Sequence, residues 1–82
     1  MTGPTIITEL RKNARERVRV ALDEYQGHHL LDIRVLAQLT ESSDVWTGTK
    51  KGVAVNVALI PALREALEAA EVQARQMGWL VG

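Results

Sequence analysis

The sequence of 82 residues contains no cysteine and no phenylalanine, and its only aromatic residues are two tryptophans and one tyrosine. The absence of cysteine excludes disulfides and thiolate metal sites. A chain of this length buries only about 60–65 % of its unfolded surface, so its core needs reinforcement. With disulfides and thiolate metal sites excluded, self-association is the expected reinforcement.

Long apolar runs are also absent. No run approaches the roughly 18 residues of a membrane-spanning helix. The first residues, MTGPTIITEL, lack the basic start and the apolar stretch of a signal peptide. The apolar fraction of 46 % is typical of a folded domain and argues against disorder. We therefore expect a cytoplasmic protein with no membrane partner.

The chain has no net charge, because ten Lys and Arg residues balance ten Asp and Glu residues. Neutrality counts mildly against nucleic-acid binding, since dedicated binders are usually basic. The cations are nevertheless clustered: residues 11–19, Lys50 and Lys51 hold seven of the ten. The acids are spread along the chain, so the positive charge is concentrated locally.

Residues 15–25 fit two kinds of secondary structure. With a period of two, alternate apolar residues share one face, namely Val18, Val20 and Leu22. With helical spacing, a different apolar set aligns, namely Ala14, Val18, Leu22 and Tyr25. The β-branched valines and a glycine two residues after Tyr25 favour a strand followed by a turn.

The flanking segments complete a predicted meander. Residues 1–10, with a glycine and a proline near the start, are expected to form an arm. Residues 29–39 predict a central strand, because apolar and charged residues alternate there. A polar loop at 40–44 precedes the remaining segments, which are a short strand at 45–49, a turn at 50–52 and a strand at 53–57.

The last third of the chain has a helical period. One stripe carries apolar residues, namely Leu63, Leu67, Ala70, Ala74 and Met77. Asn56 is the expected N-cap, Pro61 belongs to the first turn, and Gly78 ends the helix. We expect this helix to cover the valine face of the sheet, and its alanines suit the close approach of a second helix.

The predicted fold class is therefore α+β, a four-stranded antiparallel meander sheet followed by one C-terminal helix (β-β-β-β-α). We expect an N-terminal arm at 1–10, one domain at 11–78 and a C-terminal tail at 79–82. Trp79 in this tail is expected to anchor the tail to the domain or to a partner subunit.

Four short motifs follow one another along the chain: EYQGH, LDIRV, TKKG before the last strand, and the helix sequence ALREALEAA. In this order and spacing, the segment from about Leu10 to Ala70 resembles the C-terminal domain of the transcriptional coactivator positive cofactor four, particularly its short prokaryotic relatives. The resemblance implies that residues 15–25 are a strand. It also implies a homodimer that binds single-stranded DNA across its curved sheets.

The family's cationic and aromatic contact positions are implied to fall on Tyr25, His28, Arg34, Lys50 and Lys51. Trp46 lies where many prokaryotic relatives carry tryptophan. One departure from the eukaryotic pattern is Ala37, which stands where that pattern has an aromatic residue.

A groove for single strands needs cations that follow the phosphates and flat side chains on which bases stack. In a strand at 15–25, Arg17 and Arg19 project from the face opposite the valines, and Arg34 can join them on that face. The complete set of candidate nucleic-acid-binding residues is Arg17, Arg19, Tyr25, His28, Arg34, Trp46, Lys50 and Lys51.

The function we expect is largely sequence-independent binding of single-stranded DNA by a coactivator-like, nucleoid-associated homodimer. RNA or melted duplex is a further substrate, and the transcription machinery a further partner. Two alternatives stay open. In the first, the clustered cations only keep the protein soluble and discourage aggregation of sheet edges, without binding DNA. Neutral net charge and Ala37 are also compatible with a protein-interaction module that binds DNA weakly or not at all.

No enzyme activity, metal or cofactor is expected. His28 and His29 are adjacent in a predicted strand, so they point to opposite faces, and no third ligand has suitable spacing. Ser42 and Ser43 lie in a polar loop without an evident base. The sequence GTKKG lacks the spacing of a Walker phosphate loop.

Overall fold

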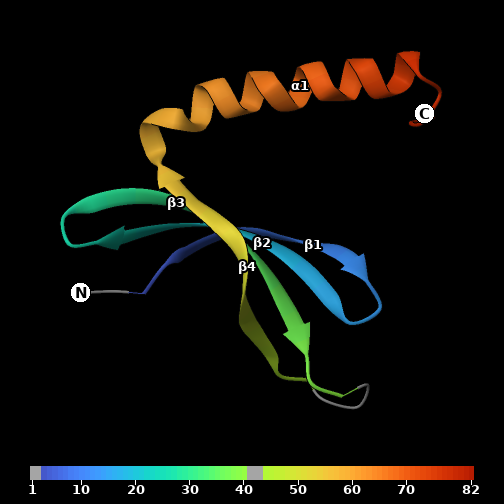
Figure 1. Cartoon of the computed structure of the whole chain (residues 1–82). Coiled ribbons are helices and arrows are strands. Elements are labelled where there is room, and N and C mark those ends of the chain that lie inside the picture. Colours follow the sequence, from blue (N-terminus) through green and yellow to red (C-terminus); the bar gives the residue numbers. More distant parts are fainter. Residues whose placement is uncertain (1–2, 41–43) are drawn as a thin grey trace.

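The computed structural model describes residues 3–40 and 44–82. Its elements are β1 (Thr5–Asn13), β2 (Glu16–Tyr25), β3 (His28–Gln38), β4 (Trp46–Asn56), the short 3-10 helix η1 (Val57–Leu59) and the helix α1 (Ile60–Gln76). The strands form one antiparallel sheet in the order β1-β2-β3-β4 (Figure 1). The predicted α+β class, with four meandering strands and a C-terminal helix, is confirmed.

The two central strands lie close to where the sequence places them, but the first strand does not. Residues 5–10, expected to belong to an arm, form most of β1 and pair with β2. Thr5, Ile6, Ile7 and Thr8 are consecutive β-branched residues, which favour an extended backbone. That run is the physical reason for a strand here.

The fourth strand is also longer than expected. The two short strands at 45–49 and 53–57, with a turn between them, are in fact one strand, β4. The residues of the expected turn form an irregularity in its pairing with β3, between Gly48 and Gly52. A Cβ at Gly52 would collide with the carbonyl oxygen of Ile33, so glycine is required for this close approach of the backbones. Of the expected loop at 40–44, residues 41–43, including Ser42 and Ser43, lie outside the described residues.

Two tight turns fix the register of the sheet. Between β1 and β2, the side-chain oxygen of Asn13 accepts a hydrogen bond from the Arg15 N–H at 3.0 Å, which is an Asx turn. Between β2 and β3, Gln26 and Gly27 have φ angles of 50° and 80°. Two positive φ angles in a two-residue loop are those of a type I′ turn, whose twist matches the flanking strands.

Cross-strand pairing defines two faces. Directly paired residues point to the same side, and alternate residues along a strand point to opposite sides. One side, the arginine face, carries four arginines: Arg11, Arg17, Arg19 and Arg34. The other side, the valine face, carries aliphatic residues: Leu10, Val18, Val20, Leu22, Leu31, Ile33, Val35, Val53 and Val55.

The helix ends as the sequence predicts, but its start differs: Asn56 caps the 3-10 helix η1, and α1 begins after Leu59, which makes no side-chain cap hydrogen bond. The Asn56 side chain caps η1 by accepting a hydrogen bond from the Ala58 N–H at 2.8 Å. Pro61 lies in the first turn of α1, where its missing N–H disrupts no helical hydrogen bond. Gly78, with a φ of 76°, follows the last turn.

The expectation that α1 covers the valine face is wrong for a single chain. No residue of α1 is buried, and Leu67 on its apolar stripe is 62 % exposed. On the valine face, Val53 is 51 % exposed. Figure 1 shows α1 leaving the end of β4 through η1 and running apart from the sheet. The turn made by η1 thus carries α1 away from the valines of its own chain.

A single chain therefore has almost no closed core. Among the described residues, only Ala21, Leu31 and Leu36 are buried apolar residues. The radius of gyration is 15.1 Å, whereas a compact domain of this length has about 12 Å. No helix in residues 3–40 or 44–82 is long and apolar enough to span a membrane.

Candidate nucleic-acid interface

Four guanidinium groups converge on the arginine face from three neighbouring strands. Arg19 on β2 pairs directly with Arg34 on β3, and Arg17 on β2 pairs directly with Arg11 on β1. Like charges placed directly opposite each other destabilise a sheet. This arrangement costs stability that a bound anion would restore.

Two carboxylates partly neutralise these arginines. Arg34 donates to Asp32 at 2.7 Å, with about a quarter of each side chain or less exposed, and Arg17 donates to Glu9 at 3.1 Å. The Arg17–Glu9 pair is accessible to water, and such a pair contributes about 0–1 kcal/mol. A phosphate can therefore replace Glu9 at small cost, whereas the Arg34–Asp32 pair is shorter and part-buried.

Arg34 is held in place by more than its ion pair. Its guanidinium also donates to the Thr49 carbonyl oxygen at 3.4 Å. A Cβ at Gly52 would lie 3.1 Å from the Arg34 Cζ atom, so the arginine lies over the backbone of β4 at this glycine. The absence of a side chain at Gly52 thus positions Arg34 on the face.

Arg19 contains the one unsatisfied buried side-chain polar atom in the described part of the chain. Its Nε atom is shielded from solvent and has no hydrogen-bond partner. A buried donor without a partner costs about 1–3 kcal/mol.

Trp46 lies on the arginine face, at the end of the sheet where the β1–β2 turn is located. It pairs with Gln38 on the same face, and its ring extends across β3 to β2. The Arg17 Cζ atom is 4.0 Å from the centroid of this ring, which is a cation–π contact. Trp46 and Arg17 together present flat surfaces beside the cations.

Tyr25 and His28 belong to the same face but to its opposite end. They pair directly across β2 and β3 at the type I′ turn. From Arg17 to Tyr25 the strand advances by about 26 Å. The Tyr25 side chain is 63 % exposed, so its ring is accessible. His29 points to the other face, as expected for two adjacent residues in a strand.

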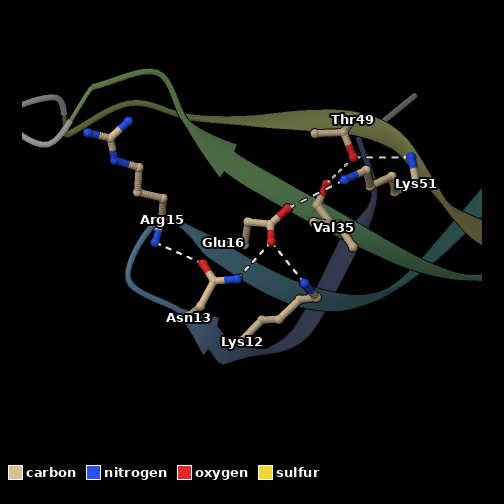
Figure 2. Close-up of polar contacts among 7 residues, drawn as sticks. All are labelled: Lys12, Asn13, Arg15, Glu16, Val35, Thr49 and Lys51. Carbon is tan, nitrogen blue, oxygen red and sulfur yellow. Dashed lines mark hydrogen bonds and ion pairs between the residues drawn. The ribbon is translucent and has the colours of Figure 1, made fainter.

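The structure does not bring Lys51 to the arginines. Its Nζ atom is 3.9 Å from Glu16, and the Glu16 carboxylate also accepts from Lys12 and Asn13 at 2.8 Å (Figure 2). Glu16 pairs with Ala37 on the valine side of the sheet. The irregularity between Gly48 and Gly52 explains the difference, because it interrupts simple alternation along β4. Lys50 is exposed within this irregular stretch.

The cluster around Glu16 has an electrostatic consequence. The hydrogen bond from Lys12, followed by that from Asn13, holds the pKa of the Glu16 carboxyl below its ordinary value of 4.5. Both donors stabilise the ionised form. Glu16 therefore links the β1–β2 hairpin to β4 by its ion pairs with Lys12 and Lys51.

Sequence reasoning missed three residues of this face: Arg11, Glu9 and Asp32. Glu9 falls in the expected arm at 1–10, and Arg11 belongs to the cation cluster at 11–19 without a predicted strand to place it on this face. The β-branched run at residues 5–8 was the available signal for that strand. Asp32 lies two residues before Arg34 in the expected strand at 29–39, so strand alternation was the available signal that both share one face. Its contact shows that the arginine face carries its own anions.

Two other kinds of site receive no support. Among the residues described by the structure, no group of three or more His, Asp or Glu side chains could hold a metal ion. A hollow of about 590 Å³ lies at the β2–β3 turn, but Asp23 and Glu24 line it. These acids repel phosphate, so the hollow does not extend the candidate interface.

Comparison with known proteins supports the fold. No family model and no curated protein matches the chain. Two crystal forms of BPSL1147, described as a PC4 homolog from Burkholderia pseudomallei, are similar in structure. The orthorhombic form has a TM-score of 0.74 at 20 % identity, over 87 % of this chain and 93 % of that chain. The tetragonal form has a TM-score of 0.73 at 20 % identity, over 84 % and 98 %. The chain therefore has the fold of a PC4 (positive cofactor four) homolog.

Proposed function

We propose that this chain binds single-stranded DNA on its arginine face, largely independently of sequence. The observation that carries the proposal is the gathering of four arginines on one face, with Arg19 directly opposite Arg34 and Arg17 directly opposite Arg11. Phosphate oxygens along a strand are the anions that such a face attracts. The fold shared with a PC4 homolog supports the same function.

The bound strand runs along the face between its two aromatic ends. Trp46 lies near one end and Tyr25 near the other. The arginines occupy the half of the face nearer Trp46, and Asp23 lies two residues from Tyr25 on the same face. Aromatic rings stack on bases of any sequence, and arginines follow the backbone. Lys50 adds charge at the β4 edge, and His28 lies beside Tyr25. Because Lys51 is paired with Glu16, its contribution is the weakest of the proposed residues.

We also propose that the working form is a homodimer. The valine face and the apolar stripe of α1 are both exposed in one chain and do not cover each other. A second copy offers the complementary partner for each surface. Burying apolar area contributes roughly 25 cal/mol per Å², which a chain with so small a core needs.

The cellular part of the proposal is a coactivator-like or regulatory role in transcription, carried out in the cytoplasm at the nucleoid. The resemblance to positive cofactor four and the PC4 homolog are its support. The arrangement acts by binding and charge, and no catalytic role is proposed for any residue.

Fluorescence anisotropy with a labelled oligonucleotide tests the binding. We expect affinity for single strands to fall with salt, with a log–log slope of about −0.7 for each phosphate neutralised. Parallel titrations with duplex and with RNA of the same sequence establish the preferred substrate. No binding of any strand at low salt by the folded protein would refute the proposal.

A second candidate is a protein-interaction module of the same fold. The ion pairs of Arg17 with Glu9 and of Arg34 with Asp32 favour it, because they reduce the free charge of the face. The double substitution Arg34→Ala with Lys50→Ala distinguishes the two functions. Unchanged DNA affinity together with loss of a protein partner would favour the module.

A further inference from the structure

The arginine face opens into a small pocket at the β1–β2 turn. Its volume is about 160 Å³, and it is lined by Arg11, Asn13, Ala14, Arg17 and Trp46. One water molecule occupies about 30 Å³, so the pocket has room for a larger group. These residues come from β1, its turn, β2 and β4, and the pocket is therefore built by the sheet as a whole.

Its lining combines flat surfaces with positive charge. Arg11 and Arg17 are directly paired. The Arg17 guanidinium lies over the Trp46 ring, with 4.0 Å between its Cζ atom and the ring centroid. Both an indole and a guanidinium plane stack on nucleobases, and arginine also binds phosphate bidentately. A single nucleotide has both matching parts, a flat base and an anion.

The polar group best suited to recognise a base edge is already occupied. The Asn13 amide donates to Glu16 at 2.8 Å, and its oxygen accepts from the Arg15 N–H at 3.0 Å. Hydrogen-bond readout by Asn13 would break this turn. Recognition in the pocket must therefore depend on stacking area and charge rather than on a donor and acceptor pattern.

We propose that this pocket is a subsite for one nucleotide of the bound strand and that it prefers purines. The base stacks on the Arg17–Trp46 pair while Arg11 holds a neighbouring phosphate. Purines are preferred because their larger rings cover more of the stacking surface. Adenine and guanine are accepted alike, since Asn13 is not free to distinguish them. This inference rests on the proposed binding of single-stranded DNA and adds a preference to it.

The first arm of the test uses the unchanged protein. Oligo-dT strands of one length are compared with the same strands carrying one central dA or one central dG. We expect either purine to raise affinity about threefold, a small part of the roughly 5- to 150-fold effect of a full base stack. An abasic site in place of the purine should lose the gain.

The second arm assigns the effect to Trp46. In Trp79→Phe, Trp46 is the sole tryptophan, and we expect the purine strand to change its emission more than oligo-dT does. Trp46→Leu should remove the purine gain. Trp79→Leu is the matched control and should retain it, because Trp79 is 76 % exposed beyond the far end of α1.

The possible results distinguish a failure of the purine subsite from a failure of single-stranded DNA binding. Tight binding with equal affinity for all strands and unchanged Trp46 emission would overturn the subsite and leave the proposed function intact. A purine gain that persists in Trp46→Leu would also overturn it. Failure of every strand to bind would remove both. If Trp46→Leu does not fold, the affinities of the unchanged protein for the different oligonucleotides and the Trp46 emission of Trp79→Phe still test the subsite.

Discussion

Arg19 and Arg34 lie directly opposite each other on adjacent strands, with the Arg19 Nε atom buried and without a hydrogen-bond partner. Two guanidinium groups in this position repel each other. Asp32 compensates Arg34, and Glu9, although paired in register with Arg19, binds Arg17 instead. These two ion pairs of the face involve Arg17 and Arg34, and the proposed function places the phosphates of a bound strand along the same face.

The Glu9 carboxylate should compete with nucleic acid for Arg17. We expect Glu9→Gln to raise the affinity for single-stranded DNA about 1.4- to fivefold, because an accessible ion pair is worth roughly 0.2–1 kcal/mol. Anisotropy titration at one salt concentration measures the change. Glu71→Gln is the control, since it removes the same charge from an ion pair with Arg75 on α1. An equal gain in DNA affinity in Glu9→Gln and Glu71→Gln would show that the net charge of the protein, and not the Arg17–Glu9 pair, determines the effect.

Glu16 should make stability depend on pH. Its pKa is lowered in the folded chain by Lys12 and Asn13. The resulting stabilisation is complete above the unfolded pKa and is lost as pH falls through the lower folded pKa. We expect the stability difference between the unchanged protein and Glu16→Gln to shrink as pH falls below about 4.5. Urea unfolding at several pH values and one protein concentration measures it, and a constant difference would contradict the assignment.

Two glycines of β4 should respond differently to alanine. At Gly52 a Cβ would collide with the Ile33 carbonyl oxygen, whereas at Gly48 its nearest neighbour would be 3.9 Å away. We expect Gly52→Ala to lower the free energy of unfolding by about 1–3 kcal/mol, as other overpacked sites do. Gly48→Ala should be neutral or slightly stabilising. Thermal unfolding of both variants provides the comparison, and similar losses in the two would contradict the close approach at Gly52.

Self-association should depend on one side of α1. Leu67 belongs to the apolar stripe and is 62 % exposed, whereas Val72 is 55 % exposed on the opposite side of the same helix. We expect Leu67→Asp to shift the protein from dimer to monomer in analytical ultracentrifugation. Val72→Asp should leave the dimer intact. Dissociation by Val72→Asp alone would place the interface elsewhere.

Local patterns in the sequence predicted the central part of the fold well. Alternating valines predicted β2, alternating apolar and charged residues predicted β3, and the apolar stripe followed by Gly78 predicted α1. Each of these signals is contained within one element, so it needs no knowledge of neighbours. Placing Arg17, Arg19 and Arg34 on one side required only that period of two, and the register confirms it.

The remaining features depend on contacts between distant segments. A lysine pair followed by glycine suggests a turn, but Gly52 is needed for its approach to the Ile33 backbone within a strand. The contact of Trp46 with Arg17 crosses β3 and depends on the twist of the sheet. The apolar stripe of α1 predicts that the helix packs against an apolar surface, but the stripe alone does not identify that surface.

The most direct test of the account removes two charges from the arginine face and two from elsewhere. We expect Arg19→Ala with Arg34→Ala to weaken binding of single-stranded DNA at least tenfold and to reduce the salt slope by about 1.4. Arg64→Ala with Arg75→Ala removes the same charge from α1 and should leave affinity and slope nearly unchanged. Equal weakening by both pairs, or by neither, would contradict binding on the arginine face.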